Sequence, residues 1–185
     1  MRIIGGTARG LHLSPVGAGD AQAHLRPTSD RVREAIFNLL INGGYGNPLN
    51  GARILDVFAG TGALGLEALS RGATEAVFIE NGAAATALLK RNIALMRAEN
   101  VSEILRRDAS KPGLNPGAAF DVIFLDPPYG KAMGEAALMA LSTWLAPEAL
   151  VIWEENVPPK APPGFEQLDK RRYGDTLVTI LKAPA

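Results

Sequence analysis

The 185-residue chain has no cysteine, only two histidines and no long apolar run. Without cysteine there are no disulfides or thiolate metal sites, and the isolated His12 and His24 lie in loop-like sequence, so no metal site is expected. The amino terminus lacks the roughly 7 to 15 apolar residues of a secretory signal, and no segment approaches the about 18 apolar residues of a membrane helix. These absences indicate a soluble, cytoplasmic protein without a membrane partner.

An excess of charge of one sign is also lacking, because 19 lysines and arginines balance 19 aspartates and glutamates. This balance excludes a protein that binds nucleic acid over its whole surface, but it allows a local basic face. Residues 1–50 hold five arginines and no lysine against three acidic residues. The length suits one domain, 1–185, and we expect a monomer in which residues 1–50 form an amino-terminal extension and residues 51–185 the core.

Short apolar runs alternate with amphipathic stretches along the chain. Strands buried on both faces of a parallel sheet are predicted at 52–58, 75–80, 120–126 and 149–154. Helical spacing predicts helices over 63–71, 83–99 and 132–146, the last ended by Pro147. The alternation predicts an α/β fold with a doubly wound, mostly parallel sheet that finishes in an antiparallel hairpin over 165–182.

The ends of the chain depart from this alternation. Residues 2–13 predict a small hairpin, and Pro27-Thr28-Ser29-Asp30 predicts the start of a helix. Trp144 and Trp153 are expected in the core. Glu154-Glu155 is expected at a strand end in water.

A glycine-rich loop follows the first predicted core strand. Gly60, Gly62 and Gly65 form a G-x-G-x-x-G pattern between a strand and a helix, which is where such a pattern binds a nucleotide. Glu80 lies 20 residues after Gly60, at the end of the next strand, where a carboxylate can accept both ribose hydroxyl protons. Asp56, just before the loop, suits a ligand with positive charge. We therefore expect S-adenosylmethionine, with its sulfonium and ammonium groups, rather than NAD.

A second motif, Asp126-Pro127-Pro128-Tyr129, follows the strand 120–126. The two prolines hold the backbone extended, so that the Asp126 carboxylate and the Pro127 carbonyl can accept hydrogen bonds from an exocyclic amine. Tyr129 offers a flat face for an extruded base. Two accepted hydrogen bonds favour a pyramidal, nucleophilic nitrogen, and no general base is required because the proton leaves after the nitrogen has become cationic.

These motifs resemble those of class I S-adenosylmethionine-dependent amino-methyltransferases. Three further stretches, Arg2-Ile3-Ile4-Gly5-Gly6 with Arg9-Gly10, the run from Arg26 to Asn38, and Tyr173-Gly174-Asp175-Thr176, are similar to the bacterial enzymes that methylate N2 of a guanine in 16S rRNA. The resemblance extends from residue 2 to about 181. It implies a seven-stranded Rossmann-like sheet, S-adenosylmethionine as cofactor, and 16S rRNA or the small ribosomal subunit as partner.

The resemblance also implies roles for individual residues. Catalytic roles are implied for Asp126, Pro127, Pro128 and Tyr129. Cofactor contacts are implied for Asp56, Phe58, Ala59, Gly60, Thr61, Gly62, Glu80, Asn81, Asp108 and Ala109. RNA contacts are implied for Arg2, Arg9, Arg26, Thr28, Arg31 and Arg33. Without the resemblance, three charged segments are equally well explained as solvated surface. Arg106-Arg107-Asp108 suits a strand end in water, and the Arg26 to Arg33 segment suits a solvated helix face. Lys170-Arg171-Arg172 suits a solvated hairpin edge.

The leading hypothesis is methylation of guanine N2 in small-subunit ribosomal RNA. The Asp-Pro-Pro-Tyr motif also permits an adenine N6 in DNA or RNA as acceptor, and only the amino-terminal segment favours guanine. A nucleic-acid-binding module without activity and an NAD oxidoreductase are weaker alternatives. Both would differ from the leading hypothesis in whether the protein binds S-adenosylmethionine.

Overall fold

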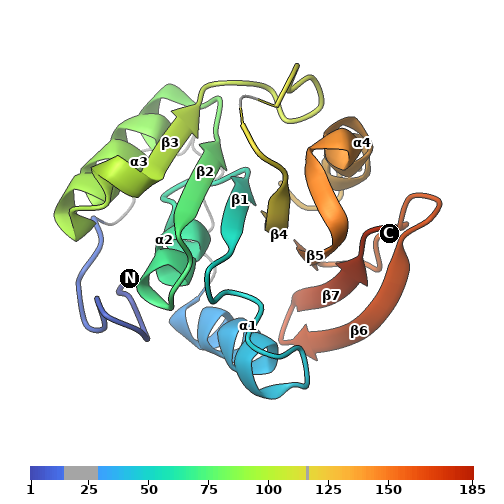
Figure 1. The fold of residues 1–185 in the computed structure, drawn as a ribbon, viewed down its shortest axis with the longest axis horizontal. Helices are drawn as coiled ribbons and strands as arrows, with labels where there is room; N and C mark the ends of the chain where they lie inside the picture. The colour runs from blue at the N-terminus through green and yellow to red at the C-terminus, as the bar shows by residue number, and fades with distance from the viewer. Residues whose placement is uncertain (15–28, 116) are drawn as a thin grey trace.

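The computed structural model describes residues 1–14, 29–115 and 117–185. Within them, seven strands form one sheet of order β3-β2-β1-β4-β5-β7-β6, in which β7 runs antiparallel to both of its neighbours (Figure 1). The strands are β1 (Arg53–Val57), β2 (Glu75–Ile79), β3 (Ser102–Leu105), β4 (Phe120–Leu125), β5 (Leu145–Glu155), β6 (Glu166–Tyr173) and β7 (Thr176–Lys182). The helices are α1 (Asp30–Asn42), α2 (Ala63–Ser70), α3 (Ala83–Met96) and α4 (Met133–Leu141), with 3₁₀ helices η1 (Glu99–Val101) and η2 (Ser142–Trp144). The doubly wound, mostly parallel sheet predicted from the sequence is confirmed.

The sheet is buried on both faces because successive residues of a strand point to opposite sides. Ile54 of β1 and Phe124 of β4 lie in one core with α1, α2 and α3. Leu55 and Val57 lie in a second core with α4. The continuous apolar runs of the central strands follow from this double burial.

The amino-terminal residues add a small element to the face that α1, α2 and α3 cover. Arg2 and His12 pair as an antiparallel bridge, which confirms a small hairpin in this region. Ile3 and Leu13 are buried in the same core as α1. Ser29 caps α1 by accepting a hydrogen bond from the Val32 N–H at 3.3 Å, as the sequence predicts.

The strand order places the ends of β1 and β4 side by side. These two strands are parallel neighbours, with Val57 opposite Leu125, and the strand order reverses between them. In open α/β sheets, ligands bind at the carboxyl edge of such a reversal point. Because β7 is antiparallel, its first residue, Thr176, lies at this same edge, next to Leu177, which pairs with Glu155 of β5.

The helix predicted over 132–146 is wrong in its second part. α4 ends at Leu141, and Pro147 lies inside β5 rather than at a helix end. The buried indole of Trp144 stacks on Phe120 and donates a hydrogen bond to the Gly113 carbonyl at 3.3 Å. These tertiary contacts outweigh the helical preference of the local sequence, so the α-helix ends before Trp144. The β4–β5 register shifts just beyond Phe120, and the missing N–H of Pro147 is accommodated in that irregular stretch.

The third helix also ends earlier than expected. α3 stops at Met96, and Arg97 follows in the left-handed conformation with φ of 55°, which interrupts the predicted 83–99 helix. Trp144 and Trp153 are buried, as predicted. Among the helices of the described residues, none is long and apolar enough to cross a membrane.

Candidate functional site

The loop after β1 is tightly packed against α3 and β2. Gly62, at the start of α2, has a φ of +76°, and a Cβ there would lie 2.3 Å from Leu89 of α3. A Cβ at Gly65 would lie 2.4 Å from the ring of Phe78 on β2. Phe58, which opens the loop, is a non-glycine residue with a φ of 61°, and such conformations concentrate at ligand sites. The glycine pattern therefore lets the helix and the loop approach the sheet closely.

The carboxylates of Asp56 and Glu80 accept hydrogen bonds from the backbone of the glycine-rich segment. Asp56 is 1% exposed and accepts a hydrogen bond from the Gly65 N–H at 2.9 Å. Glu80, just after β2, accepts from the Gly60 N–H at 2.9 Å and from the Gly82 N–H at 2.7 Å. Glu80 therefore joins the loop after β1 to the start of α3, at the edge where a ribose is expected.

A shallow hollow lies beside Glu80 at the carboxyl ends of β1, β2 and β3. Its volume is about 190 Å³ with open solvent included, and its lining combines apolar and polar residues. Its lining residues are Phe58, Ile79, Glu80, Asn81, Arg107 and Ala109. A flat ring with hydrogen-bonding edges suits such a surface. Four of the predicted cofactor residues thus come together here.

Asp108 does not line the hollow. Its side chain is exposed, and Oδ1 accepts hydrogen bonds from the hydroxyl and the N–H of Ser110, both at 2.8 Å. These bonds lower the pKa of Asp108 from its ordinary value. The neighbouring Arg107 lines the hollow instead and donates to the Pro112 carbonyl at 2.7 Å. Sequence reasoning missed Arg107 because a charged group such as Arg106-Arg107-Asp108 at a strand end equally suits water.

Three carboxyl groups, of Asp56, Glu80 and Asp126, interact at the carboxyl edge of the sheet. Burial raises the pKa of Asp56 well above its usual value of 3.8, the Gly65 N–H lowers it, and the nearby Asp126 and Glu80 raise it further. An ionised Asp56 is therefore costly in the protein by itself. A cationic group bound between these side chains would reduce that cost. The edge suits a positively charged ligand.

The Asp126-Pro127-Pro128-Tyr129 segment leaves β4 directly beside the glycine loop. The Asp126 N–H donates to the Val57 carbonyl at 3.4 Å, which connects the ends of β4 and β1. Pro127 is buried, and Tyr129 is half-buried. Burial is the main factor that raises the pKa of Tyr129 to about 12, so its hydroxyl is neutral at physiological pH.

One residue of β5 and one of β7 contact this segment. The Tyr129 hydroxyl lies 3.3 Å from the Thr176 hydroxyl, and the Gly130 N–H donates to the Glu155 carboxylate at 3.2 Å. Glu154-Glu155 ends β5, as predicted, but the expected exposure to water is wrong, since the two residues are 1% and 5% exposed. Sequence reasoning missed the contacts of Thr176 and Glu155 because they depend on how β5 and β7 pair.

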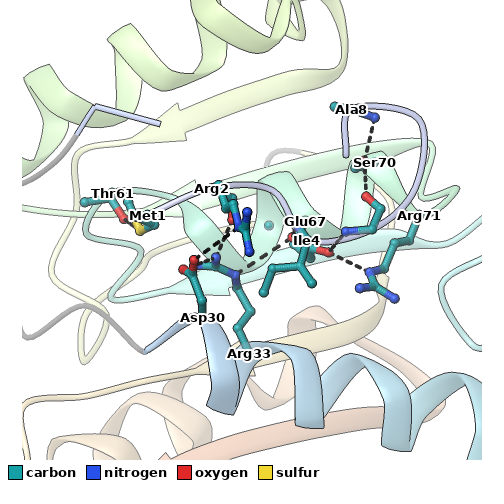
Figure 2. A network of polar contacts seen from close by, with 12 residues as sticks. Met1, Arg2, Ile4, Ala8, Asp30, Arg33, Thr61, Glu67, Ser70 and Arg71 are labelled. Carbon is teal, nitrogen blue, oxygen red and sulfur yellow. Dashed lines mark hydrogen bonds and ion pairs between the residues drawn. The ribbon is translucent and has the colours of Figure 1, made fainter. Parts of the chain in front are cut away.

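The amino-terminal hairpin is anchored on α2 by a buried glutamate (Figure 2). Glu67 is fully buried and accepts from the Ile4 and Gly5 N–H groups, each at 2.8 Å. It also accepts from Arg71 Nε at 2.7 Å and lies 3.8 Å from Arg33 Nε. Arg33 is fully buried, so the predicted contact of Arg33 with RNA is wrong.

The same hairpin reaches the glycine loop. Met1 Sδ lies 3.6 Å from the Thr61 hydroxyl. The two residues are labelled side by side in Figure 2. The buried Asn92 of α3 accepts from the Ser14 N–H at 2.7 Å and donates to the Thr61 carbonyl at 2.9 Å. The predicted cofactor residue Thr61 is therefore held between the hairpin and α3.

The other predicted RNA contacts differ in their surroundings. Arg2 keeps 63% of its side chain exposed and lies 3.8 Å from Asp30, while Arg9 and Arg31 are exposed. Arg26 and Thr28 lie outside the described residues. In the part of the chain that the structure describes, no three acidic, histidine or cysteine side chains are grouped so as to hold a metal ion.

The sequence and the fold are similar to those of known proteins. A protein family described as conserved hypothetical protein 95 matches residues 1–182. Ribosomal RNA small subunit methyltransferase D of Escherichia coli (strain K12) is 40% identical over 159 residues, which cover 85% of this chain and 75% of that protein. The protein of the same name from Haemophilus influenzae is 35% identical over 183 residues, covering 94% and 89%. The solved structure of yhhF from Escherichia coli has a TM-score of 0.83 at 36% identity, over 100% of this chain and 98% of the other.

Proposed function

The chain belongs to the family of the bacterial ribosomal RNA small subunit methyltransferase D, and we propose that it transfers a methyl group from S-adenosylmethionine to the exocyclic N2 amine of a guanine in 16S rRNA. The observation that carries this proposal is the adjacency of two motifs at the carboxyl edge. The glycine loop follows β1, the Asp-Pro-Pro-Tyr segment follows β4, and a hydrogen bond from Asp126 to Val57 joins their starting points. A cofactor and an acceptor base bound to these two segments would meet at the reversal of strand order.

The residues around the glycine loop fit S-adenosylmethionine by their chemistry. The apolar Phe58 and Ile79, which line the hollow, suit an adenine ring, and Glu80, which also lines it, suits the ribose hydroxyls. Burial raises the pKa of Asp56, and the nearby Asp126 and Glu80 raise it further. A ligand that carries sulfonium and ammonium charges suits this acidic group of side chains. Gly60, Thr61 and Gly62 would line its methionine part.

Bound S-adenosylmethionine would supply an electrophilic methyl group, and the electron pair of the broken C–S bond would stay on sulfur. The chain's own contribution is to orient the amine. The Asp126 carboxylate and the Pro127 carbonyl would accept the two N–H groups and direct the nitrogen lone pair at the methyl group. Alignment of this kind accounts for a large part of a rate enhancement. After the N–C bond forms, the cationic nitrogen loses a proton to water.

The acceptor base must leave its RNA stack to reach this edge. Tyr129 would stack on the extruded base, a contact worth about 1 to 3 kcal/mol. Its hydroxyl is neutral at physiological pH, so the stacking face carries no charge that would repel RNA. The exposed Arg2, Arg9 and Arg31 would contact phosphates, and Arg26 with Thr28 stay predictions for the same surface. The partner would be the small ribosomal subunit or its RNA, in the cytoplasm.

The decisive experiment uses purified protein, methyl-labelled S-adenosylmethionine and small ribosomal subunits from a strain that lacks the native activity. The RNA is digested and the labelled nucleoside is identified. Labelled N2-methylguanosine is the expected result. Labelled N6-methyladenosine would agree with S-adenosylmethionine as the methyl donor but would show that the acceptor is adenine and not guanine. Failure to bind S-adenosylmethionine in calorimetry would favour a nucleic-acid-binding module without activity.

A further inference from the structure

The Asp-Pro-Pro-Tyr segment is supported by residues of β5 and β7, the two strands that follow β4 in the order of the sheet. We propose that Thr176, at the start of β7, is a positioning residue that orients Tyr129 for the acceptor base, and that Glu155 of β5 supports it by fixing the turn that follows. The proposal rests on the function proposed above, because it gives Tyr129 its stacking role. Thr176 itself would touch neither the base nor the cofactor.

The topology explains why a residue of β7 reaches this segment. In the parallel strands β1 and β4, the first residues lie at the edge opposite the site. β7 runs the other way, so its first residue lies at the carboxyl edge, where Leu177 pairs with Glu155. The Thr176 hydroxyl is thereby 3.3 Å from the Tyr129 hydroxyl, across 47 residues of sequence. The reversal of one strand supplies a hydroxyl at an edge where a parallel strand would supply only its last residues.

A second contact fixes the other end of the segment. Gly130 has a φ of +74°, and its N–H donates to Glu155 Oε1 at 3.2 Å. Glu155 is 5% exposed, so this acceptor is shielded from water. With the Asp126 N–H bonded to Val57, the segment from 126 to 130 is held at its start, at the tyrosine hydroxyl and at its end.

The consequence for the reaction concerns the tyrosine ring. The hydrogen bond fixes the position of the Tyr129 hydroxyl and thus the direction of the ring axis, and the half-burial of the ring restricts its rotation about that axis before RNA binds. A base that stacks on a preoriented ring loses less conformational freedom on reaching the methyl group than one that must order the ring as it binds. Loss of the Thr176 hydroxyl should therefore lower kcat while the KM for the cofactor stays unchanged.

β7 contains a matched control for this experiment. Thr179 is fully buried, and its hydroxyl has no hydrogen-bond partner among the described residues. It lies three positions along the strand from Thr176, so its side chain points to the other face of the sheet. Thr179→Val removes a hydroxyl from the same strand by the same substitution and should leave methyl transfer unchanged.

The test is a double-mutant cycle on methyl transfer to small ribosomal subunits. Thr176→Val and Tyr129→Phe should each lower kcat about 3- to 10-fold, which corresponds to one neutral hydrogen bond, and the double variant should be no slower than the slower single variant. Thr176→Ser keeps the hydroxyl and should stay within about twofold of the wild type. Multiplicative losses in the double variant, or no rescue by serine, would overturn the proposal.

A second measurement does not depend on activity. The protein has three tyrosines, so ¹³C-labelled tyrosine gives few ring signals, and Tyr129→Phe identifies the signal of Tyr129. Thr176→Val should shift that signal and Thr179→Val should not. An unshifted signal overturns the positioning role even if RNA is methylated. If the wild type labels no ribosomal RNA, the proposed function fails, and the ring signal still decides whether Thr176 orients Tyr129.

Discussion

Replacement of Glu67 by glutamine tests how the amino-terminal hairpin is held on the core. The Glu67 carboxylate, fully buried, accepts from two backbone N–H groups, of Ile4 and Gly5, and contacts the guanidinium groups of Arg33 and Arg71. Glutamine has the same shape but offers one oxygen and one NH₂ group. At least one backbone N–H then loses its acceptor, Arg71 loses its negatively charged partner, and Arg33 keeps only its ion pair with Asp30.

The magnitude follows from the burial of these groups. An unsatisfied buried N–H costs about 1 to 3 kcal/mol, and removal of one partner of a buried ion pair costs about 3 to 5 kcal/mol. The two effects share the same carboxylate and are not additive, so we expect Glu67→Gln to lower the free energy of unfolding by about 3 to 5 kcal/mol. For a chain of this length, 1 kcal/mol lowers Tm by about 2 to 4 °C, which gives a decrease of about 6 to 20 °C.

Urea unfolding gives the free energies, and Glu75→Gln is the matched control. Glu75 pairs with Arg53 at 2.7 Å but is 38% exposed, so its loss should cost about 1 kcal/mol or less. Hydrogen exchange at the Ile4 and Gly5 amides should accelerate in Glu67→Gln and stay slow in the control. If Glu67→Gln were as stable as Glu75→Gln, the reasoning from burial would be refuted.

Three further predictions concern the proposed site. Asp126→Ala should lower kcat by roughly 10²-fold or more with little change in S-adenosylmethionine affinity, and calorimetry showing an equal loss of affinity would place the residue in the cofactor site instead. Because folding raises the pKa of Asp56, the wild type should lose stability as the pH rises above about 4. Asp56→Asn should therefore have the higher Tm at neutral pH, and this difference in Tm should disappear towards pH 4. The variant should also bind the cofactor less tightly. Joint replacement of Arg2, Arg9 and Arg31 by glutamine should reduce the slope of log affinity for RNA against log salt by about 0.7 to 0.9 per lost phosphate contact, and an unchanged slope would place RNA elsewhere.

Both motifs of the site were predictable because each depends on local sequence. Gly60, Gly62 and Gly65 follow a strand and open a helix, and the ends of parallel strands meet at one edge whatever their separation in the chain. The hydroxyl of Thr176 was not predictable in this way. Its contact with Tyr129 requires the order and direction of the strands, which no local pattern specifies.

Arg33 illustrates a different limit of sequence reasoning. Ile36, Phe37 and Leu40 follow it by three, four and seven positions, so helical spacing already places Arg33 on the apolar face of α1. Its charge favoured an RNA contact instead. Its nearest acidic partner, Asp30 at 2.8 Å, lies one turn earlier on the same helix. The fully buried Glu67, 3.8 Å away, lies on another helix, and only the packing of α1 on α2 reveals that pair.

The unequal sequence separations within the site bear on how it assembles during synthesis. The Asp56–Gly65 and Glu80–Gly60 bonds span 9 and 20 residues, whereas the Tyr129–Thr176 contact spans 47. Contacts close in sequence form sooner than distant ones, so the β1–β3 half can order while later strands are still being made. The Asp-Pro-Pro-Tyr segment gains its last support when β7 adds to the sheet. A nascent chain would thus acquire its cofactor half first and its competence for methyl transfer only near the end of translation.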